Sequence, residues 1–409
     1  MTADVPALTP FSRYQKFVVG LLATLQFAVI IDFMLMAPLG AMIMPALSMS
    51  TRQFGLVVSA YAFSAGLSGL LTAGFADRFD RKKLLLFFYS GFVIGTLWCG
   101  LATSFETLLL ARVVTGVFAG VIGSIVLAIA ADLFAPQSRG RVMGVIQTAF
   151  AASQVLGLPV GLYLANHWGW HAPFLLLAAM GAAGGLVIVL AMRPVADHLA
   201  ARQEHTAFRH LFNTLATRRH WAAFAATALL TTGGYMLMPF SSAFTVNNLG
   251  IDITSLPTVY LFTGLCTIVT GPLIGRASDA FGKLPVFYVG SALTIIMVTI
   301  YTHLPNVPLP WVVLVNAVLF VGIFSRLIPF QAMVAGVPEP SHRGAFNAVS
   351  SAIQQLSGGF ASLLAGHIVL IGVDGKLQHF DVVGYLLVAT TLIAGYLVWR
   401  VQRGLLVGN

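Results

Sequence analysis

The sequence predicts an all-α integral membrane protein with twelve transmembrane helices in two pseudo-symmetric six-helix bundles. Three observations predict this fold class: the apolar composition, the placement of the basic residues, and an internal repeat. Hydrophobic residues make up 58% of the 409 residues and charged residues only 9%, whereas a soluble domain carries about 25% charged residues. This composition excludes a nucleic-acid-binding domain, a secreted disulfide module and almost any soluble enzyme.

Twelve apolar segments are long enough to cross a bilayer, which takes about 20 residues per helix. We expect helices because the alternating pattern of a membrane β-barrel strand is absent. The expected spans are 17–44, 54–76, 84–102, 107–132, 142–165, 171–192, 221–246, 256–277, 284–302, 311–335, 345–371 and 382–400. The sequence therefore predicts an N-terminal bundle (1–192), a linker loop that has room for a short surface helix (193–220), and a C-terminal bundle (221–409).

The lysines and arginines lie almost entirely on one side of these spans. Eighteen of the 22 fall in segments on the same side as the N-terminus, only Arg52 and Lys376 fall on the other side, and Arg112 and Arg326 lie within spans. Because cytoplasmic loops are enriched in basic residues, both termini are expected in the cytoplasm. The net charge of +9 then reflects membrane topology, and we expect the lipid bilayer, not a nucleic acid, as partner.

Similar segments recur about 202 residues apart. Residues 32–36 (Asp-Phe-Met-Leu-Met) return as residues 234–238 (Gly-Tyr-Met-Leu-Met), and Asp77 returns as Asp279. The dipeptide Arg139-Gly140 returns in residues 343–344. Because all three pairs occupy corresponding places in the two halves, they indicate a duplicated six-span unit. Parallel halves of this kind enclose a central site in one class of transporters.

The loop after the second span (residues 73–83) reads Ala-Gly-Phe-Ala-Asp-Arg-Phe-Asp-Arg-Lys-Lys. It resembles the first signature of the major facilitator superfamily, although Ala73 and Asp80 stand where glycines are usual. The resemblance implies a latch between the halves, in which an acid accepts helix N–H groups and pairs with a basic residue. An ordinary basic loop that anchors the topology is the alternative. The latch residues are Asp77, Arg78, Arg81, Asp279 and Lys283.

Spans four and five carry further likenesses to this superfamily. Arg112 is followed by Gly116, Gly120 and Gly123, and span five contains the run Gly157-Leu-Pro159-Val-Gly161 that is similar to sugar-efflux and drug-efflux branches. The run from Arg326 to Phe346 is similar to bacterial arabinose-efflux permeases. Glycines at these spacings let helices approach closely in lipid, so we interpret Gly116, Gly120, Gly157 and Gly161 as packing residues. Pro159 removes a backbone hydrogen bond and is expected to kink span five.

The resemblance covers essentially the whole chain and implies a secondary active transporter in a bacterial inner membrane. It favours proton-coupled efflux of small amphipathic drugs or sugar-like metabolites by alternating access. An organic-anion or sugar importer or uniporter of the same fold is the alternative, and an integral-membrane lipid-modifying enzyme is the alternative from another class. No P-loop, hydrolase elbow or metal-ligand spacing is present, so we expect no enzyme activity, no cofactor and no metal. A proton gradient is the expected energy source, and a monomer the expected state.

Three charged residues lie clearly inside spans: Asp32, Arg112 and Arg326. A charge at the bilayer centre costs about 2.5–3.5 kcal/mol on insertion scales, so such residues are functional candidates by default. Asp32 and Arg112 are predicted at similar depths, and we expect them to carry and control the coupled proton. A permanent structural pair is the alternative. Arg326 is expected to contact substrate, or else to bond nearby backbone carbonyls or Asp32.

Polar residues in other spans are weaker candidates. They can contact the solute, or they can simply form hydrogen bonds between helices. The residues assigned here to substrate binding are Gln26, Tyr235, Asn316 and Gln354.

Overall fold

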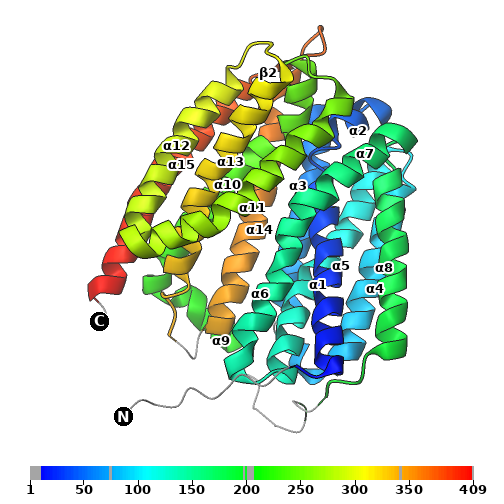
Figure 1. Ribbon diagram of the computed structural model, residues 1–409, viewed down its shortest axis with the longest axis vertical. Helices are drawn as coiled ribbons and strands as arrows, with labels where there is room; N and C mark the ends of the chain where they lie inside the picture. Colours follow the sequence, from blue (N-terminus) through cyan, green and yellow to red (C-terminus); the bar gives the residue numbers. More distant parts are fainter. Residues whose placement is uncertain (1–10, 73–75, 197–198, 200–206, 340–342, 408–409) are drawn as a thin grey trace.

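The computed structural model describes residues 11–72, 76–196, 199, 207–339 and 343–407. The described chain is almost entirely helical (Figure 1). The N-terminal half contains α1 (Arg13–Leu35), α2 (Gly40–Ala46), α3 (Thr51–Thr72), η1 (Ala76–Arg78), α4 (Arg81–Gly100), α5 (Phe105–Leu133), α6 (Pro136–Ala152), the π-helix η2 (Ser153–Gly157), α7 (Leu158–Trp168) and α8 (Ala172–Ala191). The remainder contains α9 (Ala207–Ala216), α10 (Arg218–Asn247), η4 (Ile253–Ser255), α11 (Leu256–Phe281), α12 (Lys283–Thr302), α13 (Leu309–Val334), α14 (Arg343–Ile368), β1 (Leu370–Ile371), β2 (Leu377–Gln378) and α15 (Phe380–Val407).

The membrane fold class predicted from the sequence is confirmed. Among the described residues, eleven helical segments are long and apolar enough to cross a membrane, and one of them is the continuous stretch formed by α6, η2 and α7. The remaining expected span, 345–371, corresponds to α14, which has 26 residues but is less apolar than the other eleven segments. It packs between α3 and α10, so neighbouring helices cover much of its surface and lipid covers less.

The first expected span, 17–44, is wrong as a single helix. α1 ends at Leu35 and α2 begins at Gly40. Pro38 lies in the interruption, where its ring removes an amide donor and restricts the preceding residue. The apolar run continues through the break, so hydropathy alone does not reveal it.

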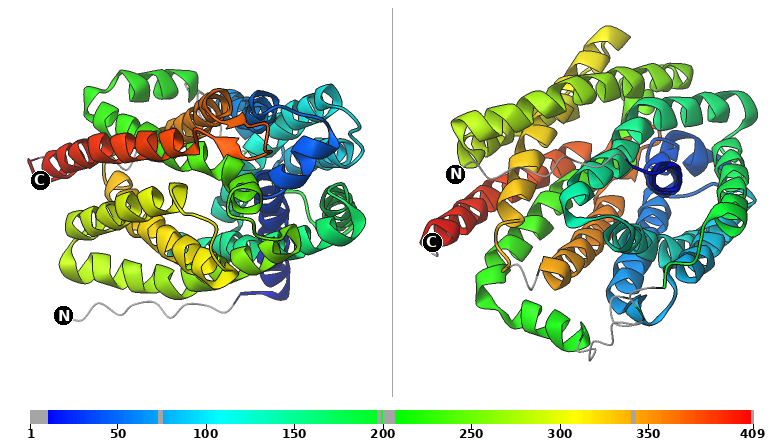
Figure 2. Two further views of the ribbon diagram at one scale, coloured as in Figure 1. Left: turned by 90° about the horizontal axis from the view of Figure 1, so that it is seen from above. Right: turned by 60° about the horizontal axis from the view of Figure 1, so that its bottom comes forward.

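The two halves repeat the same packing. Contacts of α1 with α6, α3 with α5, and α4 with α8 have counterparts in α10 with α14, α11 with α13, and α12 with α15. Figure 1 shows the C-terminal helices on the left and the N-terminal helices on the right, and Figure 2 shows the same division from above. The duplicated sequence therefore folds as a duplicated bundle.

The halves are fastened at the end of the molecule opposite the termini, which we call the far end. The end with the chain termini and α9 is called the terminal end (Figure 1). Three hydrogen bonds join the halves within the described residues, and all lie at the far end. Thr51 donates to the Val369 carbonyl at 2.6 Å, Ser242 to Ala37 at 2.9 Å, and Asn166 to Ile253 at 3.4 Å.

The segment between the halves contains the short surface helix that the sequence allowed. α9 packs beside α10 and α14 at the terminal end. Residues 197–198 and 200–206 of the expected linker lie outside the described residues.

Glycines set the distance between α3 and α5. A Cβ added to Gly116 would lie 2.5 Å from the Tyr61 carbonyl oxygen, and one added to Gly120 would overlap the carbonyl of Ala65. A Cβ on Gly123 would meet open space. The two tight positions let the helix backbones approach more closely than any side chain would allow.

Span five carries glycines against α1 and an irregular turn in its middle. Cβ atoms on Gly157 and Gly161 would collide with Ile31 and Leu35 of α1. Pro159 stands at the start of α7, directly after the π-helix η2. A proline lacks the N–H that continues a helix ladder, and single π-turns absorb such interruptions.

We predict that Gly120→Ala lowers the thermal unfolding midpoint of the detergent-purified protein, because the added methyl group forces α3 and α5 apart. Overpacking of this kind costs about 1–3 kcal/mol. The matched control is Gly123→Ala, for which space exists and the midpoint should stay or rise, since glycine in a helix costs about 0.5–1 kcal/mol relative to alanine. Equal midpoints for the two variants would contradict the close packing assigned to Gly120.

Candidate functional site

The site is built around an ion pair that is sealed from solvent inside the N-terminal half. Asp32 lies in the last turn of α1, and Arg112 lies about two turns into α5. Nη1 of Arg112 donates to Oδ2 of Asp32 at 2.9 Å, and both side chains are 0% exposed. The two charges that the sequence placed at similar depth are therefore in direct contact, and they face the bundle interior.

The two members of the pair are unequally satisfied. The other carboxylate oxygen of Asp32 accepts a hydrogen bond from the Thr96 hydroxyl of α4 at 3.0 Å. On the arginine side, Nε and Nη2 are buried without a hydrogen-bond partner among the described residues. The guanidinium instead lies over the ring of Tyr61 on α3, 4.2 Å from its centroid. A cation over an aromatic face is stabilised by the ring's negative potential.

Aromatic contacts lead from Tyr61 to the boundary between the halves. The ring of Phe33 on α1 lies 5.3 Å from that of Tyr61 and 5.8 Å from that of Tyr235 on α10. A cavity of about 10 Å³ adjoins this contact. It is lined by Phe33, Ala37, Val58, Tyr235, Met238, Pro239 and Ser362. Tyr235, a predicted substrate residue, therefore lies where the two halves meet.

Arg326 lies apart from the Asp32–Arg112 pair, inside the C-terminal half. It is 1% exposed, and its Nη1 donates to the Thr391 hydroxyl of α15 at 2.7 Å. Its Nε has no hydrogen-bond partner among the described residues. The bonded partner is thus a neutral hydroxyl, whereas the sequence suggested a carbonyl near Pro329, Asp32 or a substrate.

The remaining predicted substrate residues occupy separate places. Gln26 on α1 has a buried Oε1 without a partner among the described residues. Asn316 donates weakly to the Val312 carbonyl of its own helix at 3.5 Å, and Gln354 is exposed on α14. No hydrogen bond joins these three to the charged residues within the described part of the chain.

Two of the predicted latch residues, Arg81 and Lys283, contact helices of their own half. Nε of Arg81 pairs with Asp132 of α5 at 3.1 Å, and Lys283 donates to the Ala332 carbonyl of α13 at 3.3 Å. Arg78 and Asp279 are exposed at the terminal end. The side chain of Asp77 lies outside the described residues, so the latch stays a prediction.

Asp80 explains one of the departures from the family signature. Its Oδ1 accepts the N–H of Lys83 at 3.0 Å and caps the first turn of α4. Its Oδ2 accepts the N–H of Val195 at 3.1 Å. An aspartate at this position thus joins the start of α4 to the chain that leaves α8, a contact that glycine cannot make.

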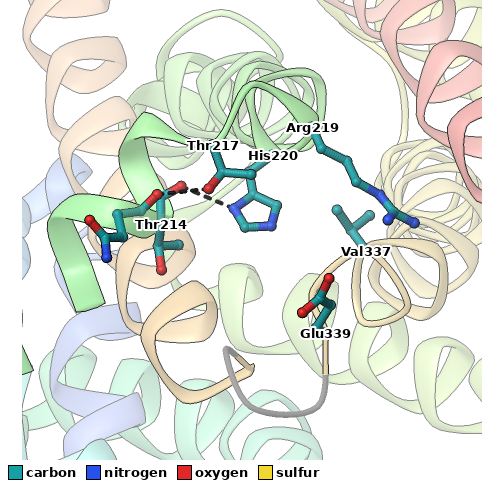
Figure 3. Close-up of a pocket in the computed structure, with 7 residues that line it drawn as sticks. Thr214, Thr217, Arg219, His220, Val337 and Glu339 are labelled. Atoms are coloured by element: carbon teal, nitrogen blue, oxygen red, sulfur yellow. Dashed lines mark hydrogen bonds between the residues drawn. The ribbon is translucent and has the colours of Figure 1, made fainter. Parts of the chain in front are cut away.

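A second cavity, of about 130 Å³, lies at the terminal end between α9, the start of α10 and the segment after α13 (Figure 3). His220 is 7% exposed there, and its Nδ1 lies 3.0 Å from the Thr214 carbonyl. Because a carbonyl only accepts, Nδ1 carries the hydrogen. The ring also packs against Phe346 of α14. This cavity accompanies the attachment of α9 and lies at the opposite end of the molecule from Asp32.

Comparison with known proteins assigns the family. The family model described as Major Facilitator Superfamily matches residues 22–327 and 223–404. The chain belongs to the major facilitator superfamily. It is therefore a multi-pass membrane protein whose fold carries out secondary transport, and the resemblance read from the sequence is confirmed.

The relatives of this superfamily member fit the same assignment. "Uncharacterized MFS-type transporter YceJ" of Bacillus subtilis is 29% identical over 375 residues, which cover 89% of the chain and 91% of the relative. "Putative transporter AraJ" of Escherichia coli is 25% identical over 234 residues, which cover 56% of the chain and 57% of that relative. The second match agrees with the predicted likeness to arabinose-efflux permeases.

Two solved structures of superfamily members share the fold. A bacterial homologue of the human lysosomal transporter Spinster, in an inward-facing and unoccupied conformation, has a TM-score of 0.74 and 19% identity, with 97% of this chain and 98% of that chain covered. A point mutant of the nucleoside transporter NupG has a TM-score of 0.73 and 14% identity, with 94% of this chain and 99% of that chain covered. At these identities the likeness shows the fold alone.

Sequence reasoning did not find Tyr61, Thr96 or Thr391. A tyrosine or threonine in an apolar run carries no signal that separates a partner of a buried charge from a lipid-facing residue. Phe33 could have been found, because it is the counterpart of Tyr235 in the repeat.

We predict that the superfamily member tolerates loss of the whole ion pair better than loss of the carboxylate alone. Asp32→Leu leaves a buried guanidinium without a counter-ion, and breaking a buried pair in this way costs about 3–5 kcal/mol. Adding Arg112→Met should recover much of the loss. Thermal unfolding midpoints of the parent, both single variants and the double variant complete the cycle, and purely additive losses would contradict a direct interaction.

Proposed function

We propose that this protein is a proton-coupled exporter of small amphipathic drugs or sugar-like metabolites that works by alternating access. The observation that carries the proposal is the Asp32–Arg112 pair, with 2.9 Å between charged atoms and 0% exposure on both sides. Buried charges within membrane spans are costly and mark proton relays in pumps and transporters. In the Asp32–Arg112 pair both side chains are fully buried, whereas in the Arg81–Asp132 pair the Asp132 side chain is partly exposed.

The pair can act as a switch because two opposing effects meet at Asp32. Burial favours the neutral carboxyl group, whereas Arg112 and the Thr96 hydroxyl favour the carboxylate. A small displacement of Arg112 shifts this balance towards the protonated form. Solute entry or movement of the halves can supply the displacement, which gives a physical basis for exchanging one proton for one solute.

We place the terminal end in the cytoplasm of a bacterial inner membrane, with both chain termini inside. The support is the excess of lysine and arginine on that side. Since the described hydrogen bonds between the halves lie at the far end, this orientation makes the present conformation closed to the outside. The Asp32–Arg112 ion pair then belongs to the state that follows release of the proton to the cytoplasm.

Efflux of amphipathic compounds is supported by the apolar boundary and by some relatives. Phe33, Tyr235 and Met238 line the small cavity between the halves, and aromatic rings with methionine suit adaptable apolar ligands. "Multidrug resistance protein fnx1" of Schizosaccharomyces pombe is 28% identical over 137 residues, covering 34% of the chain and 26% of that relative. We propose that the protein acts as a monomer, because each of the two duplicated bundles already supplies one wall of the site.

Arg326 supports a second candidate, an importer or uniporter of an organic anion or sugar. It is a buried cation bonded to a neutral hydroxyl, with a free Nε within the described chain. Guanidinium donors bind carboxylates and hydroxyls well. The direction of transport in inverted vesicles separates the two candidates.

We predict that Asp32→Asn abolishes proton-driven uphill transport but still lets the solute cross down its own concentration gradient. A growth-resistance panel in cells that lack their own efflux pumps first identifies a compound exported by the parent. In proteoliposomes, a pH gradient should then drive uphill accumulation of that compound by the parent but not by Asp32→Asn, because asparagine cannot take up the proton.

The matched control is Asp374→Asn, which removes an exposed loop carboxylate at the far end and should keep the parent's response. Uphill transport by Asp32→Asn at the parent's rate would exclude Asp32 as the proton carrier. Accumulation in the opposite direction would favour the importer.

We predict that Arg326→Ala raises the concentration of the identified compound at half-maximal transport by about tenfold or more. This is the effect of losing roughly 1.4 kcal/mol of binding free energy. Thr391→Val is the comparison, because it removes the bonded hydroxyl and leaves the cation. If Arg326→Ala kept both half-saturation and turnover, Arg326 would be a structural residue and the substrate contact would be withdrawn.

A further inference from the structure

Three aromatic rings form a continuous row from the buried ion pair to the opposite half of the molecule. The Arg112 guanidinium lies 4.2 Å from the Tyr61 centroid, Tyr61 lies 5.3 Å from Phe33, and Phe33 lies 5.8 Å from Tyr235. The four residues come from α5, α3, α1 and α10. We call Tyr61, Phe33 and Tyr235 the aromatic row.

The charge state of Asp32 acts directly on the first ring of this row. Arg112 donates through Nη1 to Asp32, and its Nε and Nη2 have no partner among the described residues. If Asp32 takes up a proton, the guanidinium loses its counter-ion, and the Tyr61 face becomes its main electrostatic partner. The Arg112 guanidinium then either moves closer to the Tyr61 ring or moves away from it towards solvent. Both movements displace Tyr61.

The row leaves little room for such a displacement to be absorbed. Tyr61 is 3% exposed, and the adjoining cavity of about 10 Å³ is close to the size of a single water. Protein interiors are close-packed, so a ring moves only if its neighbours move. Phe33 is the residue after Asp32 in α1. Protonation of Asp32 therefore also acts on Phe33 through the α1 backbone, in addition to its effect through Tyr61.

At the end of the row, Tyr235 is fixed against α14. A Cβ added to Gly358 would lie 2.5 Å from the Tyr235 ring, so the ring rests on the backbone of α14. Ser362, one turn further on, donates to the Tyr235 carbonyl at 3.2 Å. α14 also packs against α3 of the other half. Movement of Tyr235 therefore displaces α14, which packs against α3 where the two halves meet.

We propose that Tyr61 and Phe33 are positioning residues that transmit the charge state of the Asp32–Arg112 pair to the contact between the halves at Tyr235. The inference rests on the proposed function, in which Asp32 takes up the coupled proton. Protonation disturbs the row and weakens closure at the far end. When Asp32 releases the proton to the cytoplasm, the ion pair forms again and restores the row and the far-end contact.

The test measures proton uptake and movement of the halves separately, without any transported solute. Infrared difference spectra of the purified protein between mildly alkaline and acidic buffer report the C=O stretch of protonated Asp32, identified by its absence in Asp32→Asn.

Spin labels at Gly140→Cys and Gly344→Cys report the separation of α6 and α14 at the terminal end. Both positions have open space for a side chain. Cys266→Ser provides the background, and Cys99 is kept because it is fully buried.

We predict that the parent protonates Asp32 in acid and moves its halves. In Tyr61→Leu, the Asp32 band should remain, whereas the acid-induced change in the ratio of distance populations should fall about fivefold or more, the lower end of typical coupling factors. Tyr61→Phe keeps the ring and should respond as the parent does. Phe63→Leu removes a different aromatic contact between the halves, 5.9 Å to Phe360, and should also respond normally.

The outcomes distinguish this inference from the function on which it rests. If the parent shows no Asp32 band in acid, the proposed proton carrier is wrong. If the band appears but the halves do not move, or if Tyr61→Leu moves them as fully as the parent, transmission through the row is overturned while the carrier stands. Phe33→Leu repeats the test from the second ring, so that it does not depend on the folding of one variant.

Discussion

The burial of two opposite charges, Asp32 and Arg112, is the constraint on which the rest of the structure depends. Hydrocarbon cannot solvate a carboxylate or a guanidinium, so each must be satisfied by protein. Four helices meet the need: α1 and α5 supply the charges, α4 supplies the Thr96 hydroxyl, and α3 supplies the Tyr61 ring. These helices must approach closely, and the glycines between α3 and α5 make that approach feasible. The close packing of these helices and the burial of Asp32 and Arg112 therefore depend on each other.

The sequence predicted the parts of this arrangement that depend on composition and spacing along the chain. Charges are so rare in the apolar segments that Asp32, Arg112 and Arg326 could be identified directly. The repeat predicted the duplicated bundle. Each of these features depends on residue type and position alone.

Other features depend on how helices cross, which spacing does not determine. The partner of Arg112 includes Tyr61 because α3 crosses α5 at that height, and the partner of Arg326 is Thr391 for the same kind of reason. The break between α1 and α2 is hidden because the residues around Pro38 are as apolar as a continuous span. The sequence predicted a span at α14, but its packing between α3 and α10 could not be read from hydropathy.

The two halves share the same helix contacts but differ in the positions of their buried charged residues. This asymmetry bears on the mechanism. Gly234 stands in the C-terminal half where Asp32 stands in the N-terminal half, and Arg326 is bonded to a hydroxyl. With the acid in one half only, a single proton changes one side of the boundary. The other half receives that change at Tyr235, whose ring rests on the backbone of α14.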